Sequence, residues 1–249
     1  MQLEGRTTII TGAARGIGAE LATGMAARGA NVVVADVQDT AATVDKINDA
    51  GGKAIGAHVD ITDNQQLSDL VAATTDAFGG LDVLVNNAGI FADLELKPFM
   101  QTSEDEFDKI MTVNVRGMFQ ACKAVVPAMQ ANGGSIVNVS SGTFFYGPPG
   151  MLAYVTSKAA VIGMTRSMSR ELGAMGIRVN AIAPGFTESD SVLATGNFDR
   201  AREPSKAERS ISRAMLPEDL LGAVSFLSSE DSGFITGQLF NIDGGKVTY

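Results

Sequence analysis

The chain has 249 residues, and its composition excludes several classes of protein. Nineteen basic residues stand against 28 acidic ones, a net charge of −9, which argues against a nucleic-acid backbone as the main partner. One cysteine excludes an internal disulfide and suits a reducing compartment, while a single histidine argues against a histidine-based catalytic or metal site. The N-terminus leads into a strand without an apolar leader, so we expect a cytoplasmic protein that binds neither nucleic acid nor membrane.

Short apolar runs alternate with segments of helical periodicity along the chain. Strands are expected at residues 7–11, 31–35, 54–59, 81–85, 136–139, 177–183 and 238–242. Helices are expected near 19–28, 40–49 and 62–78, and from 103 and 152 onward. Thr62 with Gln65, and Ser103 with Glu106, have capping-box spacing. The alternation predicts one α/β domain over residues 1–249: a Rossmann-like, doubly wound parallel sheet of about seven strands with helices on both faces.

A glycine-rich turn joins the first strand to the first helix. Its sequence, Gly12-Ala-Ala-Arg15-Gly16-Ile17-Gly18, lets the backbone approach a pyrophosphate, which the amides and dipole of the helix N-terminus would bind. A glycine cluster by itself often marks only a tight turn. The flanking strand and helix favour cofactor binding here.

Asp36 ends the second strand, eighteen residues beyond Gly18. A carboxylate at this point accepts hydrogen bonds from an adenosine ribose and repels a 2′-phosphate. Arg15 opposes this preference, because its guanidinium can pair with such a phosphate. We therefore expect NAD as the cofactor, with NADP as the alternative.

The stretch from Ser135 to Lys158 carries the candidate chemistry. Ser141 follows a strand, and Tyr154 and Lys158 lie four residues apart in the next helix, on one face. A tyrosine and a lysine at this spacing are by themselves more often a surface pair. If the pair is functional, the ammonium lowers the pKa of Tyr154, so that the phenol exchanges protons near neutral pH. The Ser141 hydroxyl would hold an alcohol or carbonyl oxygen against that phenol.

Taken together, these motifs resemble the short-chain dehydrogenases/reductases. The resemblance runs from about Gly5 to Gly245 and rests on the glycine turn, Asn86-Asn87-Ala88-Gly89, Asn114, Ser141, Tyr154, Lys158 and Pro184-Gly185. It implies that Tyr154 is the general acid/base, that Ser141 orients the substrate oxygen and that Lys158 also holds the nicotinamide ribose. Asn114 would support a water that relays protons. The resemblance also implies a homotetramer and no metal.

Other positions follow from the resemblance. Asp60 would touch adenine with Ile61 beside it, and Asn87, Ala88 and Gly89 would line the adenosine side. Pro184, Gly185 and Thr187 would face the nicotinamide carboxamide. The family often has an aliphatic residue at the position of Thr187, which leaves the bonding there open.

Loops after three strands are expected to wall the substrate pocket. The side chains assigned to it are Ser141, Thr143, Phe144, Tyr146, Met151 and Phe186. Such walls suit an apolar or ring-bearing substrate, unless these side chains simply pack the loops. Residues 186–215 are expected to form a lid, with Pro204 at a helix start.

The basic residues Lys206, Arg209 and Arg213 are expected on one solvated face of that lid. We predict an NAD-dependent oxidoreductase that interconverts a small apolar, cyclic or aromatic secondary alcohol and its ketone. One alternative is an NADPH-dependent 3-oxoacyl thioester reductase, whose anionic carrier would meet the basic face. The other is a non-catalytic NAD-binding regulatory protein.

Overall fold

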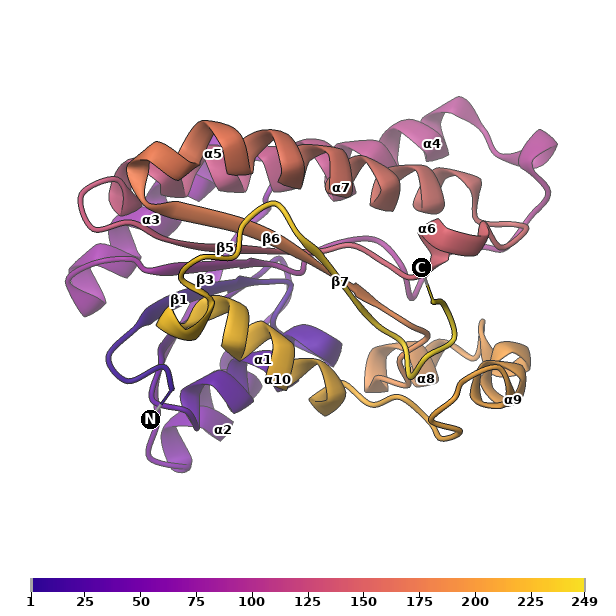
Figure 1. Cartoon of the computed structure of the whole chain (residues 1–249), viewed down its shortest axis with the longest axis horizontal. Helices are drawn as coiled ribbons and strands as arrows, with labels where there is room; N and C mark the ends of the chain where they lie inside the picture. The colour runs from indigo at the N-terminus through magenta and orange to yellow at the C-terminus, as the bar shows by residue number, and fades with distance from the viewer. Residues whose placement is uncertain (1, 249) are drawn as a thin grey trace.

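Seven parallel strands form one sheet in the computed structural model, which describes residues 2–248 (Figure 1). The strands are β1 (Thr7–Thr11), β2 (Asn31–Asp36), β3 (Lys53–His58), β4 (Val83–Asn86), β5 (Gly134–Val139), β6 (Ile177–Pro184) and β7 (Leu239–Ile242). Their order is β3-β2-β1-β4-β5-β6-β7. The predicted fold class is confirmed, with each strand end within two residues of its expected place.

Helices cover both faces of the sheet (Figure 1). One layer holds α1 (Gly16–Ala26), α2 (Ala41–Asp49) and α10 (Glu218–Ser228); the other holds α3 (Asn64–Phe78), α4 (Glu104–Met111), α5 (Met118–Met129) and α7 (Leu152–Leu172). The short helices α6 (Thr143–Tyr146), α8 (Asp190–Thr195) and α9 (Asp199–Ala207) lie beyond the strand ends. Single 3₁₀ turns span Phe99–Gln101, Gly173–Met175 and Glu230–Ser232. Within residues 2–248, no helix combines the length and apolarity needed to cross a membrane.

The central strands are buried on both faces, which explains their continuous apolar runs. Ile10 and Val34 pack with α1 and α10 in one core, whereas Ile9 and Val33 pack with α3 and α5 in the other. Successive side chains of a strand point to opposite faces, so each β-branched pair contributes to both cores.

The starts of α3 and α4 test the capping predictions. Ser103 caps α4 by accepting a hydrogen bond from the Glu106 amide, as predicted. The prediction for Thr62 is wrong, because Asp63 caps α3 instead and accepts hydrogen bonds from two amides of its first turn. The Thr62 hydroxyl is engaged elsewhere, donating to Asp60 at 2.8 Å.

The long helix expected from residue 103 is interrupted by a π-helical turn over Thr112–Gly117. Gly117 lies against Ile61, where an added Cβ would be 2.8 Å from the isoleucine side chain. The turn contains Asn114, whose side chain is fully buried. The π turn joins α4 to α5 and directs this amide side chain inward, toward Ile90 and toward Ser157 of α7.

Residues 186–215 cross the C-terminal ends of β6 and β7 and include α8 and α9 (Figure 1). Two expectations for this segment are wrong. Pro204 lies inside α9, which begins at Asp199 after the buried Phe198. Arg209 is not on a solvated face: it is 6% exposed and donates to the backbone oxygens of Phe186 and Arg213.

Candidate active site

A cavity of about 680 Å³ opens at the C-terminal ends of the strands, where β1 and β4 are neighbours and the chain order reverses. Its walls come from residues at or just after the ends of β1, β2, β4, β5 and β6, from α7 and from the 186–215 segment. Residues assigned to the site from sequence that lie on its wall are Gly12, Arg15, Ile17, Asp36, Asp60, Ile61, Asn87, Ala88, Gly89, Ser141, Thr143, Tyr146, Met151, Tyr154, Lys158, Pro184, Gly185, Phe186 and Thr187.

Four assigned residues are not on the wall. Gly16, Gly18 and Asn114 lie behind it. Phe144 points away from the cavity and is half-exposed, with its ring 5.1 Å from that of Phe145. The reason is that α6 is a single helical turn, which brings its first and last residues to the cavity and turns Phe144 to another side.

The glycine turn is shaped by close backbone contacts. Gly12 and Gly16 have φ of +65° and +63°, a region that favours glycine. A Cβ on Gly12 would lie 2.7 Å from the Cα of Ala88, and one on Gly18 would collide with the Gly12 carbonyl oxygen. The N-terminus of α1 has no side-chain cap, so its first amides are available to an anion. This cradle fits a pyrophosphate.

Asp36 lies at the end of β2 on the cavity wall. Its carboxylate accepts hydrogen bonds from the backbone amides of Ala14 at 2.9 Å and Gln38 at 3.0 Å. Arg15 points across the cavity mouth, with its guanidinium 3.7 Å from the Asp93 carboxylate. The cavity wall therefore carries a carboxylate that two backbone amides hold in place, and an exposed guanidinium lies near a second carboxylate.

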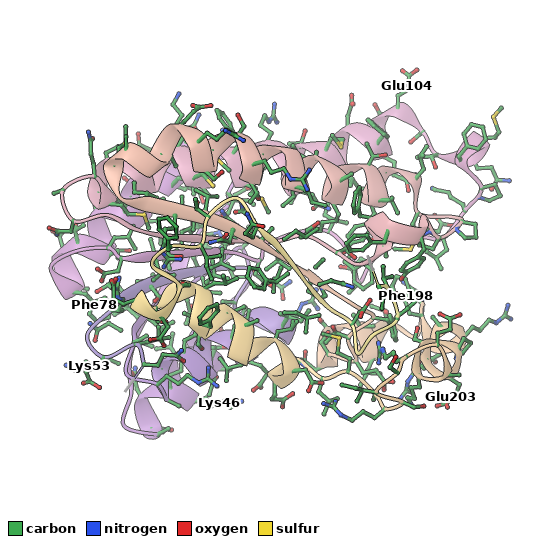
Figure 2. All side chains as sticks on the ribbon, viewed as in Figure 1. Lys46, Lys53, Phe78, Glu104, Phe198 and Glu203 are labelled. Carbon is green, nitrogen blue, oxygen red and sulfur yellow. The ribbon has the colours of Figure 1, made fainter. Side chains whose placement is uncertain are left out.

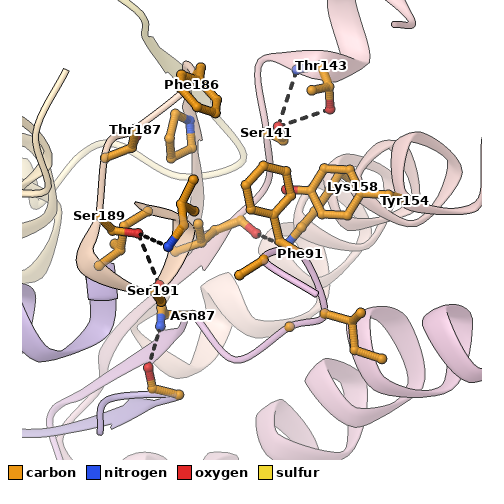
Figure 3. A pocket seen from close by; sticks show the side chains of 18 of the residues that line it. Asn87, Phe91, Ser141, Thr143, Tyr154, Lys158, Phe186, Thr187, Ser189 and Ser191 are labelled. Atoms are coloured by element: carbon orange, nitrogen blue, oxygen red, sulfur yellow. Dashed lines mark hydrogen bonds between the residues drawn. The ribbon is translucent and has the colours of Figure 1, made fainter. Parts of the chain in front are cut away.

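Asn87 directly follows β4 and is hydrogen-bonded to the end of β1; Figure 3 shows its side chain at the cavity. Its side-chain amide donates to the Thr11 and Gly12 carbonyl oxygens at 3.1 and 2.8 Å. In return, the Thr11 hydroxyl accepts hydrogen bonds from the Asn87 and Ala88 amides, both at 3.1 Å. These bonds set the spacing of the two strand ends that flank the cavity.

Tyr154 and Lys158 both project from α7 into the cavity beside Phe91, opposite Thr187 and Ser189 (Figure 3). Burial raises the pKa of the Tyr154 phenol, and a hydrogen bond with Ser141 opposes that rise. Burial lowers the pKa of Lys158 to about 8. The expectation that Lys158 lowers the pKa of Tyr154 is therefore not met.

The contacts of Lys158 give the physical reason. Its ammonium donates to the Val139 carbonyl oxygen at 2.9 Å and lies 5.7 Å from the centre of the Tyr154 ring. The ammonium is thus held against the end of β5. With its pKa raised, the phenol can donate a hydrogen bond into the cavity.

Asn114 fastens the segment after Gly89 to α7. Its side-chain oxygen accepts a hydrogen bond from the Ile90 amide at 2.8 Å, and its nitrogen donates to the Ile90 carbonyl oxygen and to the Ser157 hydroxyl. Asn114 also lies beside Gly89, whose added Cβ would be 3.1 Å from its side-chain oxygen. The amide therefore positions the backbone next to Lys158.

Aromatic rings form one wall of the cavity. The ring centre of Phe91 lies 5.0 Å from that of Tyr154 and 4.7 Å from that of Phe198, on which it stacks. The ring centres of Phe186 and Phe198 are 6.2 Å apart. Figure 2 shows Phe198 on the inner side of the 186–215 segment, whereas Glu203 is on its outer side. Sequence reasoning assigned Phe198 only to the lid, although a lone aromatic residue in a charged stretch was a usable signal for a buried anchor.

Comparison with known proteins places this geometry among dehydrogenases and reductases. A family model described as "Enoyl-(Acyl carrier protein) reductase" matches residues 12–246. A 3-oxoacyl-[acyl-carrier-protein] reductase of Thermotoga maritima is 39% identical over 99% of this chain and 100% of its own. Its counterpart in Vibrio cholerae is 38% identical, over 98% of each chain.

Solved structures show the same architecture. A short-chain type dehydrogenase/reductase of Mycobacterium marinum is 33% identical, with a TM-score of 0.89 over 100% of this chain and 97% of its own. Carveol dehydrogenase of Mycobacterium avium, in complex with NAD, is 27% identical, with a TM-score of 0.91 over 98% of each chain.

Proposed function

Because the chain belongs to the short-chain dehydrogenase/reductase family, we propose that it is an NAD-dependent oxidoreductase interconverting a small apolar, cyclic or aromatic secondary alcohol and its ketone. The observation that carries the proposal is that Ser141, Tyr154 and Lys158 line one cavity with Asp36 and the glycine turn. The side chains proposed to move the proton and the side chain proposed to select the cofactor thus face the same cavity.

The cofactor end of the cavity supports NAD. The glycine turn and the amides of α1 would hold the pyrophosphate, and Asp36 would accept hydrogen bonds from the ribose hydroxyls. Asp60, Ile61, Asn87, Ala88 and Gly89 would line the adenosine side. The backbone from Pro184 to Thr187 would face the nicotinamide, which supplies or accepts the hydride when bound.

The side chains of the chain itself would move the proton. Ser141 would hold the substrate oxygen by a hydrogen bond, and the protonated Tyr154 would donate its proton to that oxygen during reduction. Lys158, whose pKa lies at about 8, exchanges protons near neutral pH and would return one to Tyr154 and hold the ribose. Asn114 would keep the Ile90 backbone in place beside this group and support the relaying water.

The substrate end of the cavity supports a ring-bearing, apolar substrate. The rings of Phe91, Phe186 and Phe198, together with Met151, surround the space in front of Tyr154. Residues 186–215 would act as a lid that excludes water. The buried Glu188 holds this lid through Arg202 at 2.7 Å and Lys206 at 3.6 Å.

A second candidate is an NADPH-dependent 3-oxoacyl thioester reductase. Its support is that the curated relatives from Thermotoga maritima and Vibrio cholerae are 3-oxoacyl-[acyl-carrier-protein] reductases. Against it, Asp36 lies on the wall where a 2′-phosphate would be repelled. The buried Arg209 also leaves only Lys206 and Arg213 of the expected basic face for an anionic carrier.

Titration of the purified protein with NADH and NADPH separately, followed by a panel of cyclic and aryl ketones, tests the proposal. We expect tighter binding of NADH and ketone-dependent NADH oxidation. Asp36→Asn should shift the preference toward NADPH. Preference of the unaltered protein for NADPH, with turnover of 3-oxoacyl thioesters, would move the second candidate to first place.

A third reading is a regulatory protein that binds NAD without turnover. Tyr154→Phe separates it from an enzyme, because removal of one hydroxyl should lower turnover by about a thousandfold, within the range of general acid catalysis, and leave NADH affinity within about twofold. If the unaltered protein also fails to oxidise NADH when ketones are supplied, a regulatory function is favoured.

We also propose a cytoplasmic homotetramer that pairs the helices carrying Asn114 and Tyr154. The half-exposed apolar side chains of Phe119 on α5 and Leu152 on α7 support this pairing. Sedimentation that gives a clean monomer would contradict it.

A further inference from the structure

Lys246 is a cation at the substrate end of the cavity that the proposed reaction does not use. It follows β7 and lies on the cavity wall with Tyr146, Pro148 and Glu208. The other cations on that wall are Arg15, which belongs to the glycine turn, and Lys158, which is held against β5. Lys246 therefore has no role among the residues that bind the cofactor or move the proton.

The ammonium of Lys246 is fixed in place. It lies 4.0 Å from the centre of the Tyr146 ring, a cation–π contact, and its side chain is only 19% exposed. The buried Asp243 carboxylate accepts hydrogen bonds from the amides of Gly245, Lys246 and Val247. The backbone and the side-chain tip are thus both held.

Two further bonds join this C-terminal turn to the segment after α9. The Ser210 hydroxyl donates to the Gly245 carbonyl oxygen at 3.2 Å, and the Ile211 amide donates to the Gly244 carbonyl oxygen at 2.8 Å. Figure 1 shows the segment after β7 running toward α6, and the contacts of Lys246 join it to Tyr146 of α6 and to Glu208 after α9. Lys246 thus lies between α6 and the segment that follows α9.

The anion that pairs with Lys246 is much less restrained. Glu208 lies 2.6 Å from the ammonium, directly after the last residue of α9, and its side chain is 54% exposed. Water can solvate this exposed carboxylate when it turns away, and the mostly buried ammonium that it leaves then needs another anionic partner. The ammonium has three donor hydrogens, and its side chain is mostly buried beside the Tyr146 ring.

We propose that Lys246 is a specificity-determining residue that binds a carboxylate on the substrate, with Glu208 occupying the place of that carboxylate until the substrate arrives. The inference deepens the proposed function and rests on it. The substrate class becomes a secondary alcohol or ketone with an apolar, ring-bearing body and a carboxylate remote from the reacting carbon. The aromatic rings receive the body, and Lys246 receives the charged end.

Matched ketones test this inference. The ratio of kcat/KM for 4-acetylbenzoate to that for the neutral 4-acetylbenzamide is measured with NADH. We expect the unaltered enzyme to favour the carboxylate by about tenfold or more, the value of one charge-assisted hydrogen bond. Lys246→Met should abolish the preference, Lys246→Arg should restore most of it, and Glu208→Gln should increase it. Lys53→Met, on the exposed end of β3, is the matched control.

A binding measurement separates this inference from the proposed reaction. Benzoate and benzamide are titrated calorimetrically into the enzyme–NADH complex, which needs no turnover. Tighter binding of benzoate that is lost in Lys246→Met supports the carboxylate site even if neither ketone is reduced, a result that would defeat only the proposed function. Equal affinities, or a ratio that Lys246→Met does not change, overturn the inference while ketone reduction can stand.

Discussion

The burial of the Lys158 ammonium affects the stability of the folded protein as well as the proposed catalysis, and it leads to a prediction. The pKa of Lys158 is about 8 in the folded protein against 10.5 in water, and the cause is burial. At about 1.4 kcal/mol for each tenfold change in proton affinity, keeping this lysine charged costs the folded state about 3 kcal/mol below pH 8.

The direction of the pH dependence follows from proton binding. Between pH 8 and 10.5 the unfolded lysine holds a proton that the folded lysine has released. The free energy of unfolding therefore rises with pH across this window. In Lys158→Met this contribution is absent, so the stability of the unaltered protein relative to the variant should rise by about 2 kcal/mol between about pH 7 and 9.5.

Urea unfolding of both proteins without cofactor, at about pH 7, 8 and 9.5, measures that difference. Loss of the hydrogen bond to the Val139 carbonyl oxygen changes the free energy of unfolding of the variant by the same amount at each pH. It therefore does not alter how the difference between the two proteins depends on pH. Lys53→Met is again the control for removal of one charge. A difference between the two proteins that stays flat within about 0.5 kcal/mol would refute the reasoning, because the ammonium would then be solvated.

Three further predictions concern other parts of the chain. Gly18→Ala places a Cβ against a backbone carbonyl oxygen of the same turn and should weaken NADH binding by more than about tenfold in a fluorescence titration. Gly222→Ala, which meets no atom within 4 Å on α10, should leave the affinity unchanged, and equal affinities of the two variants would argue against the close-packed turn. Arg209→Met removes the buried hydrogen bond to the Phe186 carbonyl oxygen and should lower the free energy of unfolding by about 2–3 kcal/mol in urea; an unchanged midpoint would mean that the guanidinium is solvated after all. Burial raises the pKa of Cys122 to about 12, so the native protein should react with a thiol reagent at pH 8 only after unfolding, and rapid native labelling would contradict this.

Local patterns were sufficient for the sheet and for the residues at its strand ends. Apolar runs such as Val32 to Val34 are continuous because both faces are covered, and parallel strands bring their C-terminal ends to one edge. Asp36 and Ser141 were therefore assigned to the same edge without knowledge of any contact. The wrong assignment of Phe144 has a local cause too, since one helical turn cannot direct consecutive side chains to the same side.

The remaining differences arise from contacts between segments distant in sequence. Arg209 has the spacing of a solvated lid residue, but the Phe186 backbone 23 residues earlier accepts its hydrogen bond and buries it. The sequence pattern does not indicate a role for Lys246, because its position depends on contacts with Tyr146 and Glu208. Contacts of this kind, between residues far apart in the chain, produce no periodic pattern in the sequence.

The sequence by itself determined the order of strands and helices, the glycine turn and the spacing of Tyr154 and Lys158, since these depend on local backbone preferences and on the side-chain periods of helix and strand. Only the tertiary structure decided the protonation of that pair. Solvent exclusion by the surrounding elements, rather than the distance along the helix, raises the pKa of the phenol and lowers that of the ammonium.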